Sequence, residues 1–586
     1  MLKIFKRMGR TEWGLLITGV LLVIGQVYTD LKVPDYMSAI TRLVKTPGSR
    51  LSEIWLAGGL MLGCSLLSMG LTFLSGFVTA RLAATFSRNL RSALFDAVES
   101  FSLEEIDRFT TSSLITRSTN DVAQIQNFIS GGFTMMLRAP VTVGLALAKI
   151  SAKHWQWTAL TTGAVVVVLC VVAFIITYAH PRFRRLQALT DGLNQAMREN
   201  LTGIRVVRAY NAEAYQEEKF ARANDRLTNN HLQAQRAMSV MHPVMRFLNN
   251  GLTVGIYCTG SFLIVQALGT TAAIDTFSDM VVFSTYASKI LFAFMGLNFI
   301  FIQLPRASVC AARINELLDT VPSIQDGDAQ EGREGLAGVL EFRHVSFRYP
   351  GTDEDMLHDI SFTARQGETV ALIGVTGSGK STLVNLISRF YDATAGEVLL
   401  DGRNVREYTQ KALRGKLGYA PQQAVLFTGT VSSNIRYGEG PDHPDPEEAV
   451  RLAVEIAQAK SFVEAMEGGY DAAIARGGVN VSGGQKQRLS VARSVFRRPE
   501  VYLFDDTFSA LDYKTDQTLR AALKRETAGA TTLIVAQRIG TIRDADKIIV
   551  LDEGRVAGMG VHEELMKSCE LYREIAYTQL SEEELQ

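Results

Sequence analysis

The first half of the chain alternates between long apolar runs and segments rich in charge. Residues 54–80, 154–181 and 247–274 contain no Asp, Glu, Lys or Arg and consist mainly of Leu, Val, Ile, Phe, Ala and Gly. A helix needs about 20 apolar residues to cross about 30 Å of hydrocarbon, so each run is long enough. Uncharged runs of this length favour membrane spans over buried helices of a soluble protein.

Shorter apolar runs bring the number of expected spans to six. Arg138 and Lys149 interrupt one of them, and Lys289 interrupts the last. A cation inside a span is costly and is usually paired or water-facing, so Lys289 either has such a role in a polar cavity or extends its amine to the outer edge of the membrane. The expected spans are residues 13–34, 54–80, 132–152, 154–181, 247–270 and 278–304.

The arginines predict how these spans are oriented. They are concentrated in residues 81–131 and 182–246, which are also rich in helix-forming residues. Because an excess of Lys and Arg marks the cytoplasmic side, we expect both segments to be helical extensions in the cytoplasm. Residues 1–12 carry four cations and predict either a basic helix on the inner membrane surface or a frayed end. The chain is therefore expected in the cytoplasmic membrane.

The charge balance divides the chain into two pieces. The 586 residues hold 60 basic and 60 acidic side chains, but residues 1–320 hold 30 basic and 20 acidic ones. This length exceeds what one core supports. Residues 321–338 are poor in apolar residues and rich in Gly, Asp and Glu, which is typical of a linker. We therefore expect a membrane domain over 1–320, a linker over 321–338 and a separate domain over 339–586.

The second domain contains the sequence pattern of a phosphate-binding loop. The segment VALIGVTGSGKST, residues 370–382, is a β-branched strand followed by a Gly-rich loop and a helix. Its spacing, Gly-x-x-x-x-Gly-Lys-Ser, allows backbone N–H groups to surround phosphate oxygens at a helix N-terminus. The Lys would contact the β- and γ-phosphates, and the Ser would bind Mg²⁺. The expected nucleotide-binding residues here are Gly374, Thr376, Gly377, Ser378, Gly379, Lys380, Ser381 and Thr382.

Two further motifs fit a nucleotide site. The apolar strand VYLFDD, residues 501–506, ends in acids, and Asp505 fits the carboxylate that holds Mg²⁺. The second motif opens the helix KQRLSVARSVF with Ser482, Gly483, Gly484 and Gln485. A Ser followed three residues later by Gln predicts a capping box, and the same helix start predicts an anion site.

In the order of these motifs the chain resembles an ATP-binding cassette (ABC) exporter half-transporter. The resemblance implies a helical membrane bundle of six long spans, the type I exporter fold, followed by an α/β P-loop NTPase domain that binds ATP and Mg²⁺. It implies that Tyr349 in FRYP stacks on adenine and that Gln422 in YAPQQ contacts Mg²⁺ and the membrane domain. Residues 481–485 correspond to the signature that completes a partner's ATP site, with Val481 in place of Leu. Residues 509–512 correspond to the loop that crosses the dimer interface.

Three positions depart from the family pattern. The catalytic Glu that follows Asp505 is Asp506, and the switch His of the IVAHR pattern is Gln537. The shorter acid withdraws its carboxylate from the attacking water, and an amide cannot carry charge or a proton. Arg476 stands where many relatives place a Glu that faces the coupling helices. These departures resemble the degenerate subunit of heterodimeric exporters, in which Asp506, Gln537 and Gln422 form a weak hydrolytic site. A homodimer that hydrolyses slowly is the alternative.

The resemblance also implies transport. The coupling segments would lie near Glu104–Arg117 and Thr202–Glu213. An aromatic and Met-rich last span favours amphipathic, multidrug-like substrates. Its candidate lining residues are Phe292, Phe294, Met295, Asn298, Phe299 and Phe301. A lipid or peptide exporter on the same scaffold, and a regulatory subunit that senses ATP, are the other functions considered.

Overall fold

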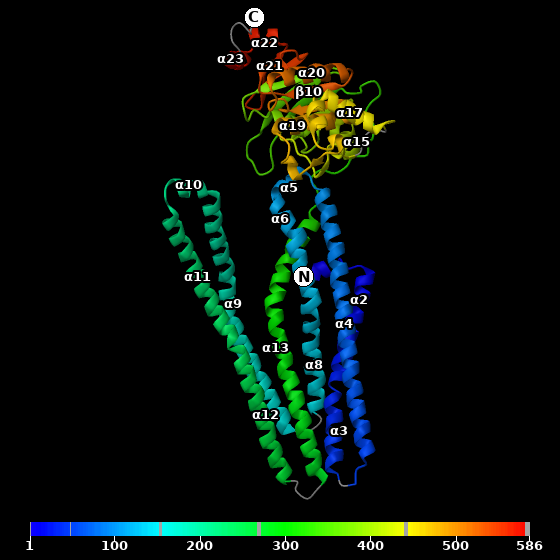
Figure 1. The fold of residues 1–586 in the computed structure, drawn as a ribbon, viewed down its shortest axis with the longest axis vertical. Coiled ribbons are helices and arrows are strands. Elements are labelled where there is room, and N and C mark those ends of the chain that lie inside the picture. Colours follow the sequence, from blue (N-terminus) through cyan, green and yellow to red (C-terminus); the bar gives the residue numbers. More distant parts are fainter. Residues whose placement is uncertain (1, 47, 152–154, 267–270, 439–442, 580–586) are drawn as a thin grey trace. The chain divides into compact units, whose positions relative to one another are not determined.

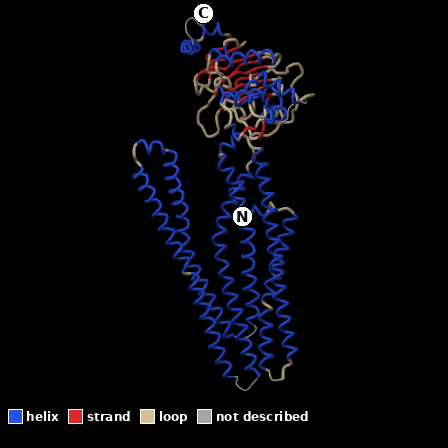
Figure 2. The backbone as a smooth tube through the Cα atoms, in the orientation of Figure 1, coloured by secondary structure: helices blue, strands red, loops and turns tan. Residues whose placement is uncertain are grey.

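The computed structural model describes residues 2–46, 48–151, 155–266, 271–438 and 443–579. By its internal contacts the chain divides into two compact units. Unit 1 comprises Met1–Glu99 and Ser112–Thr320, and unit 2 comprises Ser100–Thr111 and Val321–Gln586. Figure 2 shows that the strands lie in unit 2 and that unit 1 is helical. The short segment Ser100–Thr111 thus belongs with the C-terminal half, although it lies between two helices of unit 1.

Unit 1 is a set of long helices. Three of them, α4, α9 and α13, have 48 or 49 residues, which at 1.5 Å per residue exceeds the thickness of a bilayer. Each of these three helices contains an apolar portion and continues beyond it into a polar portion. The elements are α1 (Leu2–Phe5), α2 (Arg10–Asp30), α3 (Val33–Lys45), α4 (Leu51–Glu99), α6 (Thr111–Thr116), η1 (Arg117–Asp121), α7 (Val122–Asn127), η2 (Phe128–Gly132), α8 (Phe133–Ser151), α9 (Trp155–Thr202), α10 (Ile204–Ala209), α11 (Glu213–Ser239), α12 (Met241–Gln266) and α13 (Thr271–Asp319).

Helical segments that are long and apolar enough to span a membrane cover five of the six expected spans. They are Arg10–Lys45, Leu51–Glu99, Thr111–Ser151, Glu213–Gln266 and Ala272–Phe294 within the described residues. The described apolar stretch Trp155–Val171 covers part of the expected span 154–181. Residues 152, 154 and 267–270, at the ends of three expected spans, lie outside the described residues.

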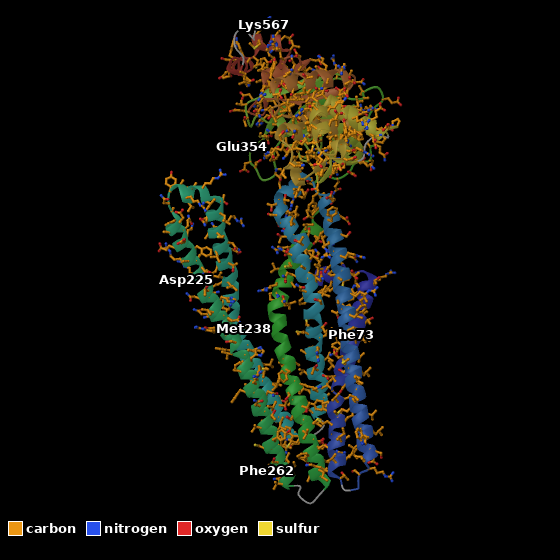
Figure 3. The ribbon with its side chains drawn as sticks, in the orientation of Figure 1. Phe73, Asp225, Met238, Phe262, Glu354 and Lys567 are labelled. Atoms are coloured by element: carbon orange, nitrogen blue, oxygen red, sulfur yellow. The ribbon has the colours of Figure 1, made fainter. Side chains whose placement is uncertain are left out.

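Large apolar side chains face outward along these helices, as a bilayer requires. Phe73 on α4 and Phe262 on α12, both labelled in Figure 3, are 77% and 64% exposed. Inward-facing residues of α2, α8, α9, α12 and α13 form one buried cluster that includes Val27, Trp157 and Tyr286. A helix that is apolar on all sides is stable only where its outer face meets lipid or protein, so unit 1 is a membrane domain.

Unit 1 also contains a long helical hairpin. Helices α9 and α11 run side by side and are joined at their tip by α10 (Figure 1). Val206 and Tyr210 at this tip are 60% and 80% exposed. The expected coupling segment Thr202–Glu213 is therefore a short helical turn with apolar side chains on its surface.

In its described residues unit 2 contains two larger sheets and a third sheet made of the short strands β7 and β8. In the largest sheet the strand order is β12-β11-β3-β10-β9-β6, and all neighbours are parallel except β11 and β12. The second sheet has the order β2-β1-β4-β5 and is antiparallel. The strands are β1 (Leu340–Phe347), β2 (Leu357–Ala364), β3 (Thr369–Gly374), β4 (Ala395–Leu400), β5 (Arg403–Asn404), β6 (Leu417–Ala420), β7 (Gly429–Thr430), β8 (Ala473–Ile474), β9 (Val501–Asp505), β10 (Thr531–Val535), β11 (Lys547–Asp552) and β12 (Arg555–Gly560).

Two apolar cores lie on opposite faces of the large sheet, because alternate residues of β3 belong to different cores. One core packs β3, β9 and β10 against α17, α19 and α20, and the other fills the space between the two larger sheets. The parallel strands are buried on both faces, as their continuous apolar runs predict. The helices and turns are α5 (Leu103–Phe109), α14 (Lys380–Ile387), η3 (Val405–Glu407), α15 (Gln410–Gly415), α16 (Val431–Ile435), α17 (Pro446–Ile456), α18 (Lys460–Ala465), η4 (Gly469–Asp471), η5 (Arg476–Gly478), α19 (Gly483–Phe496), α20 (Tyr513–Glu526), α21 (Ile539–Ile542), α22 (His562–Ser568) and α23 (Glu570–Gln579).

The expected linker, residues 321–338, packs on unit 2. The N–H of Gly327 donates to the carbonyl of Tyr408 at 3.0 Å, and Ala329 pairs with Tyr408 in a parallel bridge. The carboxylate of Asp326 accepts a hydrogen bond from the N–H of Gln410 at 3.0 Å. These backbone contacts hold the segment in place, although its composition is that of a linker.

Candidate nucleotide-binding site

The carboxyl ends of three parallel strands meet at one edge of the large sheet. Val535 at the end of β10 pairs with Asp505 of β9 on one side and with Leu372 of β3 on the other. The loops that follow β3, β9 and β10 therefore begin next to one another. Open α/β sheets bind ligands at such an edge.

The phosphate loop lies between β3 and α14, as the sequence predicts. Gly379 precedes α14 with φ +96°, and a Cβ there would lie 2.5 Å from Cδ2 of Leu357. A Cβ at Gly374 would lie 2.1 Å from the carbonyl oxygen of Leu551. Both positions therefore require glycine, one for its backbone angle and both for close packing.

Lys380 folds back over this loop. Its Nζ donates to the carbonyls of Gly374 and Val375 at 2.9 and 2.8 Å. Burial lowers the pKa of Lys380, while the nearby carboxylates of Asp506 and Asp505 oppose this change. The amine is thus held at the loop, where phosphate oxygens would replace the carbonyls as its partners.

Ser381 and Asp505 form an oxygen-rich pair beside the loop. The Ser381 hydroxyl donates to Oδ1 of Asp505 at 2.9 Å, and the Asp505 side chain is buried. Burial raises the pKa of Asp505, and the Ser381 hydroxyl partly counters this effect. Hydroxyl and carboxylate oxygens are the ligands Mg²⁺ prefers, so these residues fit that ion.

Asp506, Gln537 and Gln422 come together, although Gln422 and Asp506 are 84 residues apart in the chain. Nε2 of Gln537 donates to Oδ2 of Asp506 at 2.9 Å, and Nε2 of Gln422 donates to the same oxygen at 3.3 Å. Asp506 has φ +48°, a left-handed conformation that Asp tolerates better than most residues. The residues expected to form the hydrolytic centre thus share one carboxylate oxygen.

The environment of Asp506 favours its protonated form more than water does. The residue is 6% exposed, and burial raises its pKa, while the Gln422 and Ser509 hydrogen bonds and the charge of Lys380 act in the other direction. Two adjacent buried carboxylates, Asp505 and Asp506, need nearby positive charge to remain ionised together.

Tyr349 lies two residues after the end of β1, and its hydroxyl is 3.0 Å from Oγ1 of Thr382 on α14. Its ring packs edge-on against Phe347 and Tyr391. Tyr391 was not among the expected site residues. The motif RFYDA around it holds two aromatic residues, but this pattern alone does not separate a core residue from a site residue.

The signature residues occupy the start of α19. The N–H of Ser482 donates to Oε1 of Gln485 at 2.8 Å, and the N–H of Gln485 donates to the Ser482 hydroxyl at 3.4 Å, so the expected capping box is present. Among the described residues, the hydrogen bonds of this capping box join Ser482 and Gln485 to each other and not to the phosphate loop. A Cβ on Gly483 would meet no atom within 4 Å, so this helix N-terminus has an open face.

The cations expected inside the membrane bind the end of α2. Lys289 donates to the carbonyl oxygen of Asp30 at 2.8 Å and pairs with its carboxylate at 3.0 Å. Lys149 donates to the carbonyl of Leu31 at 3.1 Å and to the carboxylate of Asp35. The last carbonyls of a helix have no partner inside the helix and carry partial negative charge, so both lysines stabilise the break between α2 and α3.

Replacing Lys289 tests this role. Lys289→Met is expected to lower the thermal unfolding temperature, because the Asp30 carboxylate loses its partner in a low-dielectric region. Asp30→Asn should recover part of the loss, which a double-mutant cycle of unfolding temperatures measures. The matched control is Arg42→Met, since the Arg42–Asp275 pair is about half exposed and is expected to contribute little. Purely additive effects of the two substitutions would contradict the pairing role.

An apolar groove of about 680 Å³ lies on the long helical hairpin. It is lined by Val166, Val167, Cys170, Val171, Phe174, Tyr178, Ala237, Val240 and Val244. Of the expected substrate residues, the structure describes the side chains of Phe292 and Phe294, and neither lines this groove. Phe292 is 59% exposed and Phe294 packs beside the buried cluster of unit 1. The side chains of Met295, Asn298, Phe299 and Phe301 lie outside the described part of the structure.

Known protein families match both halves of the chain. The ABC transporter transmembrane region matches residues 15–295, and the ABC transporter family matches residues 357–509. An uncharacterized ABC transporter ATP-binding protein of Mycobacterium tuberculosis is 41% identical over 89% of this chain and 88% of its own length. A second such protein, from Bacillus subtilis, is 33% identical over 97% of both chains.

Two further similarities concern a function and a fold. A protein of Aromatoleum aromaticum named ATP-dependent lipid A-core flippase is 32% identical over 87% of this chain and 83% of its own length. A solved structure of a bacterial Atm1-family ABC exporter with ATP bound has a TM-score of 0.80 and covers 97% of this chain and 98% of that one, at 24% identity. The latter similarity shows the fold alone.

The helical membrane domain, the phosphate loop at the sheet edge and the matches to known families all indicate the same family of proteins. The chain therefore belongs to the ABC transporters, as an ATP-hydrolysing transporter with the ABC exporter fold that spans the cell membrane and has its nucleotide-binding domain in the cytoplasm.

Proposed function

We propose that this chain is one half of a heterodimeric exporter of amphipathic small molecules and carries its weaker ATP site. In such a dimer each ATP would lie between the phosphate loop of one chain and the signature of the other. The signature of this chain, Ser482 to Gln485, would complete the hydrolytic site of the partner. Its own phosphate loop would bind ATP and turn it over slowly.

The hydrogen bonds of Asp506 carry this proposal. The amides of Gln537 and Gln422 both donate to Oδ2, so this oxygen is already engaged where a catalytic base would accept a proton from water. A general base must lie about 2.6–3.2 Å from its target, and Asp is one methylene shorter than Glu. Gln537 cannot take up a proton as an imidazole can. The short Asp506 side chain and the neutral Gln537 would thus both slow the same step, the removal of a proton from the attacking water.

The residues around Asp506 also fit a bound Mg²⁺ ion. Ser381, Asp505 and Gln422 would hold Mg²⁺, which when bound would neutralise charge on the β- and γ-phosphates. Lys380 would bind the phosphates directly, and the N–H groups of residues 376–382 would surround them. The site would therefore bind nucleotide even where hydrolysis is weak.

The distribution of arginines supports a partner different from this chain. Arg205 and Arg208 are exposed on α10, and Arg476 is exposed on the loop before the signature. If α10 of one chain docks at this loop of the other, two identical copies would bring like charges together, which costs several kcal/mol at an interface. A partner with an acidic residue in either place would remove the repulsion. The exposed Val206 and Tyr210 on α10 also fit a surface that a partner covers.

Export of a lipid is the second candidate function. It is supported by the similarity to proteins named ATP-dependent lipid A-core flippase and by the apolar groove on the hairpin. The same scaffold would serve both substrates, since an amphipathic drug and a lipid each have one apolar and one polar end.

The proposal is tested by reconstituting the chain in vesicles, alone and with a co-expressed half-transporter that carries Glu and His at the two altered positions. We expect the chain alone to bind ATP with little turnover and the pair to hydrolyse at ordinary rates of about 1–10³ s⁻¹. Turnover in that range by the chain alone would overturn the heterodimer in favour of a homodimer.

Transport in the same vesicles separates the remaining functions. A fluorescent lipophilic cation and a labelled phospholipid are supplied as alternative probes with Mg²⁺ and ATP. Movement of the cation by the pair supports multidrug-like export, whereas movement of the phospholipid alone supports lipid export. If neither probe moves while ATP is hydrolysed, export of amphiphiles is contradicted and a regulatory subunit is favoured.

A further inference from the structure

The short helix α5 is anchored to unit 2 by a buried carboxylate. Glu105 is 5% exposed and accepts hydrogen bonds from the N–H groups of Ser102 and Ser323 at 2.9 and 3.0 Å. The hydroxyls of Ser102 and Ser323 lie 2.8 Å apart. Ser323 begins the segment that leads into the nucleotide-binding domain. The N-terminus of α5 is therefore fixed to the same unit that contains the phosphate loop.

A second contact joins the middle of α5 to a buried tyrosine. The hydroxyl of Tyr391 donates to Oδ2 of Asp107 at 2.9 Å. Tyr391 is 8% exposed, and burial, followed by the hydrogen bond to Asp107, raises its pKa. The phenol thus keeps its proton at physiological pH and remains a donor to the carboxylate.

The ring of Tyr391 in turn contacts the aromatic residue expected to meet adenine. The ring centroids of Tyr391 and Tyr349 are 5.3 Å apart with planes at 83°, the edge-to-face geometry that aromatic pairs prefer. Phe347 packs against both rings, at 4.8 Å from Tyr349 and 5.6 Å from Tyr391. The hydroxyl of Tyr349 is also within hydrogen-bond distance of Thr382 on α14.

These contacts form one continuous chain from α5 to the phosphate loop. It runs from Asp107 through the hydroxyl and ring of Tyr391 to the ring and hydroxyl of Tyr349, and ends at Thr382. Each member is held by a directional contact, so a displacement of Asp107 changes the orientation of the Tyr391 ring and hence the face that Tyr349 presents.

We propose that Tyr391 is a positioning residue that couples α5 to recognition of the nucleotide base. This inference rests on the proposed role of Tyr349 as the adenine contact. Docking of α5 orients Tyr349 for stacking, and by thermodynamic reciprocity the bound base stabilises the docked α5. Because α5 lies between α4 and α6 in the chain, the presence of the base is transmitted to a segment that continues into the membrane domain.

Binding of two ligands to the full-length chain in lipid nanodiscs tests the coupling. ATP carries a base, whereas inorganic tripolyphosphate offers the phosphate loop only phosphates, and both are supplied with Mg²⁺. Tyr391→Phe removes only the hydroxyl and is expected to weaken ATP binding about 2- to 10-fold, the range of one hydrogen bond. Tripolyphosphate binding should not change. Asp107→Ala, which removes the acceptor, should give the same loss, and the double variant should lose no more than either single one.

A tyrosine elsewhere in the domain serves as the matched control. Tyr408 is fully buried, and its hydroxyl donates to the carbonyl of Leu400 at 3.0 Å without contact to Tyr349. Tyr408→Phe is expected to lower the unfolding temperature while the ratio of ATP to tripolyphosphate affinity stays the same. A change of that ratio in Tyr408→Phe equal to the change in Tyr391→Phe would overturn the proposal, because general loss of stability would then explain both.

Hydrogen exchange of α5 measures the reciprocal effect without any enzymatic readout. ATP is expected to slow exchange in residues 103–109 of the natural chain, tripolyphosphate should not, and Tyr391→Phe should abolish the difference. Equal protection by both ligands would overturn the coupling.

Tyr349→Ala distinguishes this inference from the function beneath it. Loss of base stacking is expected to weaken ATP binding about 5- to 100-fold and to leave tripolyphosphate binding intact. If Tyr349→Ala has no selective effect, the proposed adenine contact itself fails. If it has that effect while Tyr391→Phe has none, only the coupling through Tyr391 fails.

Discussion

Gly483→Asp in the assembled transporter is expected to reduce ATP turnover at least about 100-fold, the loss seen when a preorganised anion site is removed. Gly483 opens α19, and the helix N-terminus there would face the γ-phosphate bound by the partner. A carboxylate at this position repels the phosphate. It should not harm the fold, because a Cβ at Gly483 meets no atom within 4 Å and an acid at a helix N-terminus is stabilising.

Two comparisons make this result specific. Gly483→Asn has nearly the same size without the charge and should lose much less turnover than Gly483→Asp. Lys380→Met should weaken nucleotide binding in the chain's own site and is expected to cost far less than Gly483→Asp, since in the proposed heterodimer the stronger site belongs to the partner. Steady-state ATPase assays and unfolding temperatures of each assembled variant provide the measurements. Equal losses from Lys380→Met and Gly483→Asp would contradict the unequal sites.

Asp506→Glu combined with Gln537→His is expected to raise hydrolysis in the chain's own site at least about tenfold, since a well-placed general base contributes about 10²–10⁴-fold. Glu would move the carboxylate one methylene toward the attacking water. His would remove the Gln537 amide that now donates to Oδ2 at 2.9 Å. Both changes act on the same oxygen, so their combined effect should exceed the product of the single effects.

The measurement requires a partner that does not hydrolyse ATP at its own phosphate loop. Its phosphate-loop lysine is replaced by alanine, so that the remaining single-turnover hydrolysis comes from this chain. Asp506→Gln with Gln537→His is the matched control, because it has the new length without a base and should not gain activity. If the Glu and His variant hydrolyses no faster than the natural chain, Asp506 and Gln537 do not set the asymmetry.

The positions of the site residues were largely predictable from local patterns. The strand before Gly374, the spacing to Lys380 and Ser381, and the acids after residues 501–504 each describe a short stretch of backbone whose conformation depends on near neighbours. The capping box of Ser482 and Gln485 is local in the same sense. Composition also predicted a linker over residues 321–338, but this segment pairs with Tyr408 and its neighbours, since backbone hydrogen bonds do not depend on an apolar sequence.

Contacts between distant residues could not be predicted in this way. The sequence predicts that Lys289 is paired, faces water or extends to the membrane edge, but it does not predict the partner, Asp30, which is 259 residues away. Tyr391 has no motif that marks it, and its role depends on Asp107 and Tyr349 lying on either side of it. The periodicity of a sequence predicts which face of a helix or strand is apolar. The contacts of Lys289 and Tyr391 depend instead on which helices and strands become neighbours in the fold.

The sequence by itself determined that this protein has an apolar helical half and an acidic nucleotide-binding half, because the length of apolar runs and the spacing of glycine, lysine and serine are properties of the chain alone. It also determined which side chains stand at the expected hydrolytic centre, since Asp506 is shorter than Glu and Gln537 is neutral. Only the tertiary structure decided that Gln537 and Gln422 share one oxygen of Asp506 and that α5 reaches Tyr349 through Tyr391. Those contacts arise where the ends of strands and loops converge in the fold. Hydrogen bonds and ring packing act only over a few ångströms, so they depend on which residues the fold brings together.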